Sequence, residues 1–466
     1  MRHALLALLL AAPLAAQERP ALAPSARAFV AVDAPVVALT GVRLVDGTGA
    51  PAREGHTVVV RGTRIVAVGP ARTTPVPRGA RVMDLAGHTL MPGLVSLHEH
   101  TYFGGLRQTV PMNAGAALYL GSGVTTAMTA GSQLPHQELS LKRMIDSGTL
   151  PGPRLLVTGP YFTGGPGRGS GGFVAVRDAA DAKRLVGLWA AKGATWFKVH
   201  NGPTSVLRDV IQAAHARGLR VSAHLCSVTF SEAAALGIDA LQHGFITNSE
   251  YVPGKQPDVC PPENMRAQAD VDVASPAVQE SIRRIVAGRA AVVSTLGVYE
   301  SFVPGRPLDA RALEMLAPAT RREVEANHAG LAQRGFTVPE RLLAKMMQWE
   351  RAFVAAGGLL GAGSDPWGTG FLPGFGNLRN YELLVQAGFR PEEAIQILTL
   401  NGARILGEEA RIGSIAPGKQ ADLVVVRGDP LAAPARIYDV TLVFRDGIGY
   451  DAVRLRDSAK GRVGVF

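Results

Sequence analysis

The sequence has few of the residues on which small disulfide-rich scaffolds and nucleic-acid-binding proteins depend. It has two cysteines, Cys226 and Cys260, and only 8 lysines among 48 basic residues. Two cysteines cannot form a disulfide scaffold, and the sequence leaves open whether they are paired. The net charge of +10 comes mostly from single, scattered arginines without a basic run. We therefore expect no nucleic-acid partner.

Long apolar runs are also scarce. The first, at residues 4–10, follows Arg2 and precedes the small residues Ala15 and Ala16. This arrangement resembles a secretory signal peptide spanning 1–16, so we expect an exported protein, either periplasmic or secreted. An uncleaved anchor or an ordinary apolar terminus is the alternative. The run is short for a bilayer span, and no later segment is a transmembrane candidate.

Apolar sequence as a whole is plentiful, at 47% of 466 residues, which excludes a disordered or collagen-like chain. The segments 37–90 and 411–466 both show short alternating strands separated by turns. They flank a different middle, 91–410, and a linker at 17–36 precedes them. We expect a small β-sandwich domain built from both ends of the chain, with the C-terminal tail attached to its second part.

The middle segment alternates apolar strands with helices. The expected strands are Gly93–Leu97, Val124–Thr129, Arg154–Thr158, Thr195–Val199, Leu219–Ala223, Ala240–Gln242, Ala291–Thr295 and Leu359–Ala362. Helical stretches such as 178–192, 204–217, 277–287 and 340–356 lie between most of them. Eight strand–helix repeats predict an α/β fold, a (β/α)8 TIM-like barrel, with an open doubly wound sheet as the alternative. Residues 245–276 are expected to form a long irregular insertion over one end of the barrel.

Residue types that bind metals stand where these strands end. His98 and His100 lie at positions i and i+2 of a strand, so both imidazoles face one side and can reach one metal. His224, His243 and Asp365 each end a different expected strand. The carboxyl ends of barrel strands meet at one face, where the active site is built. The pattern therefore predicts a metal centre rather than five separate structural residues.

Lys198 lies inside the expected strand Thr195–Val199, in a chain with 40 arginines and 8 lysines. Burial disfavours a charged ammonium and lowers its pKa, which leaves a nucleophilic amine. An amine that captures CO2 becomes an anionic carbamate, which is able to bridge two cations. A plain ion pair between Lys198 and Asp365 or another carboxylate is the alternative.

The order of these motifs resembles that of the amidohydrolase superfamily over nearly the whole chain. The matching elements are Met91-Pro-Gly-Leu with His98 and His100, then Lys198, His224, His243 and Gly363-Ser-Asp365. Residues 399–403 and 413–426 are similar to the superfamily's junction back into its β domain. Within the superfamily, 189–244 most resembles the branch of imidazolonepropionase-related enzymes, Xaa-Pro dipeptidase-like hydrolases and ochratoxin-type amidases.

The resemblance implies a binuclear metal-dependent hydrolase that cleaves amide or related carbon–nitrogen bonds. It assigns His98, His100 and Asp365 to one divalent ion, His224 and His243 to the other, and carbamylated Lys198 with a hydroxide to the bridge between them. Asp365 would act as general base and then as general acid. Nitrogen and oxygen ligands favour zinc, with Mn, Co or Fe also open.

Two positions depart from the dipeptidase-like relatives. Cys226 stands where they tend to carry a tyrosine, two residues after the histidine of the fifth strand, and Gly164-Gly-Pro-Gly replaces their Gly-Gly-His-Gly. A dipeptidase or carboxypeptidase of the Xaa-Pro type is therefore the alternative within the superfamily. A barrel protein that binds small molecules without catalysis is the alternative from another class.

Five residues are candidates for contact with a small amide or peptide-like substrate. They are His200, Cys226, Arg168, Tyr299 and Trp367. His200 shares a strand face with Lys198, and Arg168 is a hypothetical anchor for a substrate carboxylate. Phe302, Phe371 and Phe375, like Tyr299 and Trp367, follow the last two expected strands and could line an apolar pocket. Gly167–Gly172 formally matches a nucleotide-binding loop, but its context favours a mobile loop at the barrel mouth.

The sequence leaves open whether the protein forms a homo-oligomer.

Overall fold

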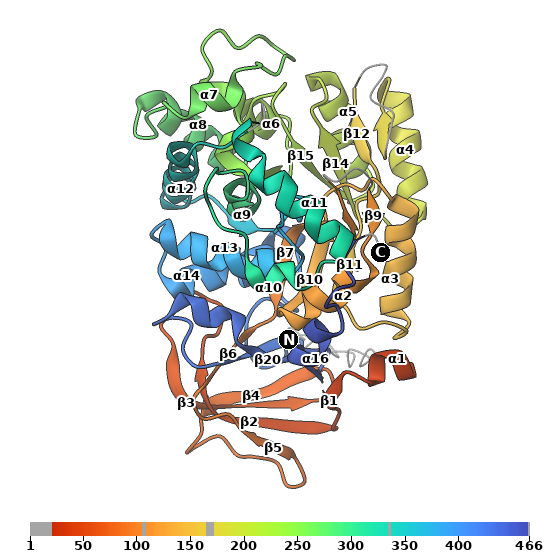
Figure 1. Ribbon diagram of the computed structural model, residues 1–466, viewed down its shortest axis with the longest axis vertical. Coiled ribbons are helices and arrows are strands. Elements are labelled where there is room, and N and C mark those ends of the chain that lie inside the picture. Colours follow the sequence, from red (N-terminus) through yellow and green to blue (C-terminus); the bar gives the residue numbers. More distant parts are fainter. Residues whose placement is uncertain (1–20, 105–108, 165–171, 334–336, 465–466) are drawn as a thin grey trace, which may run out of the picture.

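The computed structural model describes residues 21–104, 109–164, 172–333 and 337–464. Figure 1 shows three levels along the long axis: a β-sheet at one end, parallel strands with helices in the middle, and α7 (Asn264–Gln268) and α8 (Pro276–Ala287) at the other end. Within the described ranges, every helix is too short or too polar to span a bilayer.

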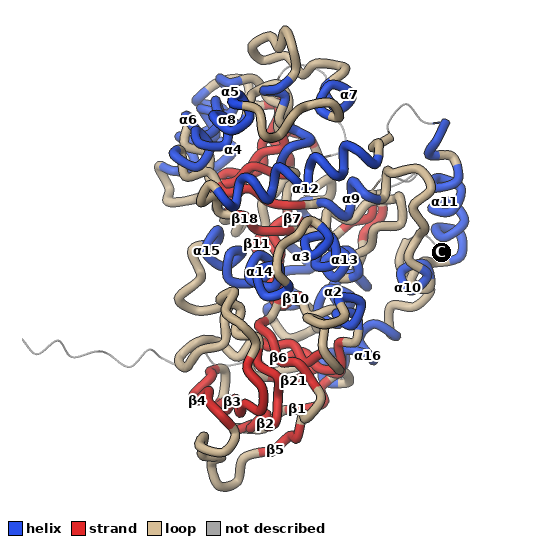
Figure 2. Tube along the Cα trace, turned by 90° about the vertical axis from the view of Figure 1, so that its left-hand side faces the viewer, coloured by secondary structure: helices blue, strands red, loops and turns tan. Residues whose placement is uncertain are grey.

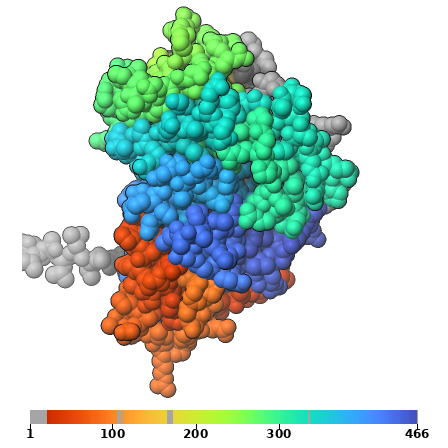
Figure 3. All heavy atoms as spheres, turned by 60° about the vertical axis from the view of Figure 1, so that its left-hand side comes forward, coloured from red at the N-terminus to blue at the C-terminus, as the bar shows by residue number. Residues whose placement is uncertain are grey.

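Both ends of the chain contribute to one nine-stranded sheet. Its strands are β1 (Val30–Val32), β2 (Val36–Leu44), β3 (Arg53–Arg61), β4 (Arg64–Pro70), β5 (Arg81–Asp84), β6 (His88–Pro92), β19 (Leu423–Arg427), β20 (Val440–Arg445) and β21 (Ile448–Asp451). They are ordered β1-β21-β20-β19-β6-β2-β3-β4, and β5 pairs with β2. The antiparallel pair β6–β19 joins the two ends, and Figure 3 shows the N-terminal part in orange next to the C-terminal part in blue.

Strand β19 explains how this sheet meets the rest of the molecule. Leu423 and Val425 pack in one hydrophobic cluster with β2 and β3, whereas Val424 and Val426 pack in the main cluster around the parallel strands. A strand buried on both faces reads as a continuous apolar run, which is what 423–426 shows. Met91 lies in β6 and pairs with Val424 of this sheet. The middle segment was expected to begin at residue 91, but its first parallel strand, β7, begins only at Leu94.

The eight expected strands of the middle segment are all present, with ends shifted by at most two residues. They are β7 (Leu94–Glu99), β10 (Val124–Thr129), β11 (Arg154–Leu156), β14 (Trp196–His200), β15 (Arg220–His224), β16 (Ala240–Gln242), β17 (Ala291–Ser294) and β18 (Leu360–Ala362). All pair in parallel, in the orders β11-β10-β7 and β13-β12-β14-β15-β16-β17-β18. The added strands β12 (Tyr161–Thr163) and β13 (Phe173–Ala175) were not expected. The fold is thus mixed α/β with parallel sheets.

Helices surround these strands (Figure 2). They include α2 (Asn113–Gly121), α3 (Pro135–Asp146), α4 (Ala179–Ala191), α5 (Thr204–His215), α6 (Phe230–Ala235), α9 (Leu296–Glu300), α10 (Ala310–Leu313), α11 (Pro318–Ala329), α12 (Glu340–Ala355), α13 (Phe375–Gln386), α14 (Pro391–Gln396) and α15 (Gly402–Leu406), while α1 (Pro24–Arg27), α16 (Ala452–Asp457) and the two-residue strands β8 (Tyr102–Phe103) and β9 (Val110–Pro111) lie outside this pattern. In α5, Val206, Leu207, Val210 and Ile211 are buried, the spacing of an amphipathic helix with one face on the strands.

The insertion 245–276 is more ordered than its sequence indicates. It contains short 3₁₀ turns at Gly244–Thr247 and Ser249–Tyr251 as well as α7. The Gln268 side chain donates to the carbonyl of Asn248 at 2.6 Å, and a disulfide joins Cys260 to Cys226. The two cysteines are therefore paired, and the insertion is tied to the end of β15.

Candidate metal centre

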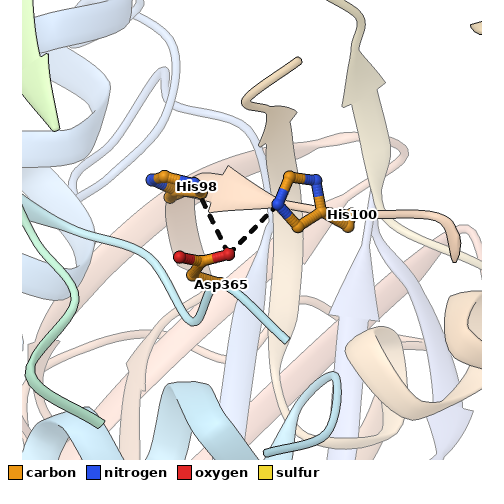
Figure 4. A group of neighbouring side chains, drawn as sticks. All are labelled: His98, His100 and Asp365. Carbon is orange, nitrogen blue, oxygen red and sulfur yellow. Dashed lines mark hydrogen bonds and ion pairs between the residues drawn. The ribbon is translucent and has the colours of Figure 1, made fainter. Parts of the chain in front are cut away.

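Three of the expected ligands come together at the ends of β7 and β18. Nε2 of His100 lies 3.1 Å from Oδ1 of Asp365, and Nε2 of His98 lies 3.6 Å from the same oxygen (Figure 4). The ligand atoms of all three residues lie within 4.8 Å of one another. Both histidines point to the same side, as positions i and i+2 of an extended segment require.

The backbone around Asp365 holds its carboxylate in this place. Asp365 has a φ of +50°, which is uncommon outside glycine, and its N–H donates to the carbonyl of His98 at 2.8 Å. At Gly363 any Cβ would lie 2.3 Å from the backbone nitrogen of His98, so only glycine permits this approach of β18 to β7. Close contact between the two strand ends therefore depends on the sequence Gly-Ser-Asp.

Lys198, His224 and His243 complete the cluster. The Lys198 Nζ lies 3.4 Å from Nε2 of His98, and Nδ1 of His243 lies 3.7 Å from Oδ2 of Asp365. The His243 ring is 4.6 Å from that of His98 and 4.5 Å from that of His224, between centroids. Six candidate ligands from five strands, Lys198 within its strand and the others at strand ends, thus lie close together.

Neighbouring polar groups fix the orientation of two of the imidazoles. Nδ1 of His98 donates to Oε1 of Gln242 at 2.6 Å, since an amide oxygen can only accept. Nδ1 of His243 lies 2.9 Å from Oγ1 of Thr295. A hydrogen bond at Nδ1 leaves Nε2 of the same ring to a metal, as in most metal-bound histidines.

The electrostatics of the cluster match a cation site. Burial, reinforced by nearby positive groups, lowers the pKa of His98, His224 and His243 well below 6.5, so these rings are neutral. Burial lowers the pKa of Lys198 to about 7. Burial opposes ionisation of Asp365, but the hydrogen bond from His100 and electrostatic interaction with the nearby His243, His100 and Lys198 side chains lower its pKa to about 2. Neutral imidazoles, a carboxylate and an amine that is readily deprotonated are the donor set that divalent metal ions require. The residues present, above all His98, His100 and Asp365, therefore fit a divalent metal ion.

A cavity of about 380 Å³ opens over this cluster. Besides the six candidate ligands it is lined by Gln133, Tyr161, Phe173, His200, Val298, Tyr299, Phe302 and Trp367. Three of the expected substrate contacts, His200, Tyr299 and Trp367, are therefore in place to meet a bound molecule. Phe302 joins them, as the position of the aromatic residues after the last two strands suggested.

Other expected contacts are not at this cavity. Cys226 is buried and bonded to Cys260 and does not line the cavity, so the prediction that it contacts substrate is wrong. Phe371 and Phe375 line a neighbouring cavity of about 320 Å³ instead, together with Arg379 and Glu300. Arg168 and most of the glycine-rich segment 167–172 lie outside the described residues.

The sequence analysis did not identify the residues that position the ligands, Gln242 and Thr295. It also did not identify Tyr161 and Phe173, which line one side of the cavity. Gln242 directly precedes His243, and Thr295 was expected to end a strand, so polar residues at buried strand ends were an available signal. Tyr161 and Phe173 gave no such signal because they belong to β12 and β13, three-residue strands without a recognisable period.

Comparison with known proteins gives matches over part or most of the chain. The profile of the "Amidohydrolase family" matches residues 354–448. N-acyl-D-aspartate deacylase from Alcaligenes xylosoxydans xylosoxydans is 33% identical over 126 residues, 26% of this chain and 23% of that protein. Imidazolonepropionase from Streptomyces griseus is 25% identical over 427 residues, 87% and 92% of the two chains. The chain thus spans about a quarter of the length of the deacylase and nearly all of the imidazolonepropionase.

Solved structures resemble the fold over most of its length. A Xaa-Pro dipeptidase with bound methionine in the active site has a TM-score of 0.65 at 20% identity, covering 89% of this chain and all of that one (100%). The ochratoxinase of A. niger has a TM-score of 0.65 at 18% identity, covering 92% and 100%.

Motifs, site and comparisons agree on one class. The chain is similar to the amidohydrolase family over residues 354–448 and to imidazolonepropionase over most of its length.

Proposed function

We propose that this protein is an exported, binuclear metal-dependent amidohydrolase that cleaves amide or related carbon–nitrogen bonds of small molecules. The observation that carries the proposal is the meeting of His98, His100, Lys198, His224, His243 and Asp365 at the floor of one cavity. Residues so far apart in sequence, each at a strand end, form such a cluster only where the fold builds a site.

The proposal includes closure of the eight parallel strands into a (β/α)8 barrel, with a separate β-sandwich domain made from both chain ends. Backbone hydrogen bonds from Asp365, after β18, to His98 of β7 and from Thr195, before β14, to Val157, after β11, link the two parallel sheets and support closure. In a closed barrel, every strand delivers its carboxyl end to the same mouth.

The chain's own groups have distinct tasks in this reaction. Bound divalent ions would polarise the scissile carbonyl and lower the pKa of water. His98, His100 and Asp365 would hold one ion and His224 and His243 the other, with Lys198, as a carbamate, between them. Asp365 accepts the proton of the attacking water on its carboxylate and delivers it to the departing nitrogen. Because the pKa of Asp365 is about 2, the carboxylate is ionised at neutral pH and ready to accept.

Zinc is the ion we expect, with Mn, Co or Fe as alternatives, because four imidazoles, two for each ion, suit a borderline cation. Metal analysis of the purified protein should find about two divalent ions per chain. Fewer than one ion per chain, in active protein, would contradict the binuclear centre.

A screen of the metal-loaded protein over neutral amides, dipeptides including Xaa-Pro, lactams and lactones tests the reaction class. Hydrolysis of at least one amide that is lost on chelation and restored by added metal is the expected result. Preference for Xaa-Pro dipeptides would support the dipeptidase alternative, and binding without hydrolysis of any compound would support a non-catalytic protein.

Export rests on the N-terminal segment alone. Cell fractionation and N-terminal sequencing of the mature protein test it, and we expect a new N-terminus near residue 17. Full-length protein in the cytosol would contradict export.

A further inference from the structure

The cavity above the metal cluster has two aromatic walls. One consists of Tyr161 and Phe173, whose rings stack at 4.7 Å and 15°, with His200 edge-on to both at 5.7 and 5.2 Å. The other consists of Val298, Tyr299, Phe302 and Trp367. Tyr299 stands perpendicular to His243, with 5.5 Å between ring centroids.

The sheet order places these walls on opposite sides of the cluster. Tyr161 and Phe173 come from β12 and β13 beside β14, whereas Tyr299 follows β17 and Trp367 follows β18. Strands β15 and β16 lie between the two groups. Strand β15 ends at His224, and His243 directly follows β16. A carbonyl held at the cluster therefore has an aromatic surface on either side.

Backbone and side-chain packing hold the walls in place. The Tyr161 hydroxyl is 2.7 Å from that of Tyr102, and backbone hydrogen bonds join Trp367 to Phe371. A Cβ on Gly104 would lie 2.9 Å from the Trp367 ring, so the turn after β8 packs closely on this indole. The aromatic surfaces are preformed, which lowers the entropic cost of binding a flat group between them.

Charge is missing from these walls. Apart from the candidate ligands, the described lining residues include no arginine, lysine, aspartate or glutamate. A substrate carboxylate or ammonium that lies against either wall, away from the metal cluster, would lose its hydration without gaining an opposite charge, which is costly. The cavity's volume of 380 Å³ is also at the low end of ligand sites, about 300–1,000 Å³, so one ring on each side fills it.

We propose, building on the function above, that the substrates are uncharged N-substituted amides that carry a planar apolar or aromatic group on both sides of the scissile carbonyl. Phe173 and Trp367 are the specificity-determining residues, one on each wall. N-acyl amino acids and dipeptides are then not the preferred substrates.

Two ketones that cannot be hydrolysed test this class by binding alone. 1,4-Diphenylbutan-1-one mimics N-benzoylphenethylamine, and 2-benzyl-4-oxo-4-phenylbutanoate mimics N-benzoylphenylalanine, so they differ only in one carboxylate. Calorimetric titration of the metal-loaded protein should give a Kd at least about tenfold lower for the neutral ketone. The corresponding amides should differ in kcat/KM in the same direction.

Substitutions on each wall test the placement. Phe173→Ala and Trp367→Ala should each raise the Kd of the neutral ketone about tenfold, because each removes one stacking surface. Leu188→Ala, on the exposed face of α4, is the matched control and should leave the Kd unchanged. Circular dichroism and metal content confirm that each variant is folded and loaded.

Equal or tighter binding of the carboxylate ketone would overturn the proposal, as would wall variants with an unchanged Kd. If Arg168→Ala then weakened the carboxylate ketone, the substrate would be an N-acyl amino acid. Binding is measured without turnover, so a preserved preference for the neutral ketone with no hydrolysis of any amide would refute the proposed function but not the binding class.

Discussion

Two carboxylates at the ends of β7 and β18 differ in what faces them. Asp365 faces the cavity and is surrounded by the imidazoles and Lys198, which lower its pKa to about 2 despite burial. Glu99 lies between His98 and His100 in sequence but points away from the cavity. Burial raises its pKa, and four donors on Ser96, Ser364 and Asn377 satisfy its oxygens.

The difference separates reactive from structural carboxylates. Burial alone favours the protonated acid, and a buried carboxylate stays ionised only where cationic or hydrogen-donating neighbours outweigh that effect, which they do at Asp365 but not at Glu99. Glu138 on α3 and Glu350 on α12, both buried, follow Glu99, with pKa values raised to about 8. Asp365 is the exception among these four and faces the cavity, as a group that exchanges protons with substrate must.

Asp365→Asn should have the largest effect. The amide keeps one oxygen ligand but cannot accept a proton, so kcat should fall about 10³–10⁴-fold while metal content stays near that of the wild type. Steady-state kinetics with a neutral amide, together with metal analysis, measure both. Retained turnover in the metal-loaded variant would remove the general-base role and with it the contrast to Glu99.

Lys198→Ala should lower metal content and reduce kcat about 10²–10³-fold, because the ligand between the two halves of the cluster is lost. Short carboxylic acids such as propionate should restore part of the activity. Lys198→Arg is the matched control, since it keeps a cation beside Asp365 but cannot form a carbamate. Full activity of Lys198→Arg would favour the simple ion pair instead.

The ligand cluster could be predicted because its residues occupy strand ends. Apolar runs ending at His98, His224 and His243 carry their position in the local sequence, and parallel strands bring such ends together whatever the loops do. The eight parallel strands themselves follow from the alternation of apolar runs and helices.

The walls and the disulfide could not be predicted in the same way. Phe371 and Phe375 follow β18 as Trp367 does, yet they line the neighbouring cavity, because the direction of a loop side chain depends on distant packing. The pairing of Cys226 with Cys260 depends on the path of the insertion, which no periodicity specifies.

Glu99→Gln makes the same chemical change as Asp365→Asn on the other side of the strand. The amide oxygen can accept from the Ser364 N–H and the Asn377 side chain, and the amide nitrogen can donate to the Ser364 hydroxyl, so kcat should fall less than about tenfold. Glu99→Ala, which leaves those donors buried and unsatisfied, should cost about 10–100-fold and lower the melting temperature. Thermal unfolding and kinetics of both variants measure this. A loss as large as that of Asp365→Asn would show that Glu99 also takes part in the chemistry.

Glu350→Gln should leave turnover within about twofold of the wild type but change how stability depends on pH. Glu350 on α12 accepts from Ser294 at 3.0 Å, and burial raises its pKa from 4.5 to about 8. Between these values the folded protein binds a proton that the unfolded chain has released. The free energy of unfolding contributed by Glu350 therefore falls as pH rises from about 4.5 to about 8, by at most about 1.4 kcal/mol per pH unit.

Glutamine cannot ionise, so this slope is absent in Glu350→Gln, and the variant gains stability relative to the wild type as pH rises from 5 to 8. Urea unfolding of both proteins at several pH values measures the difference in their free energies of unfolding. The pH dependence of metal binding is common to both proteins and therefore cancels in this difference. Glu325→Gln, on the exposed side of α11, is the control and should run parallel to the wild type. A difference between wild type and Glu350→Gln that is constant with pH would mean that Glu350 is ionised in the folded protein, and that burial behind the strands does not by itself distinguish it from Asp365.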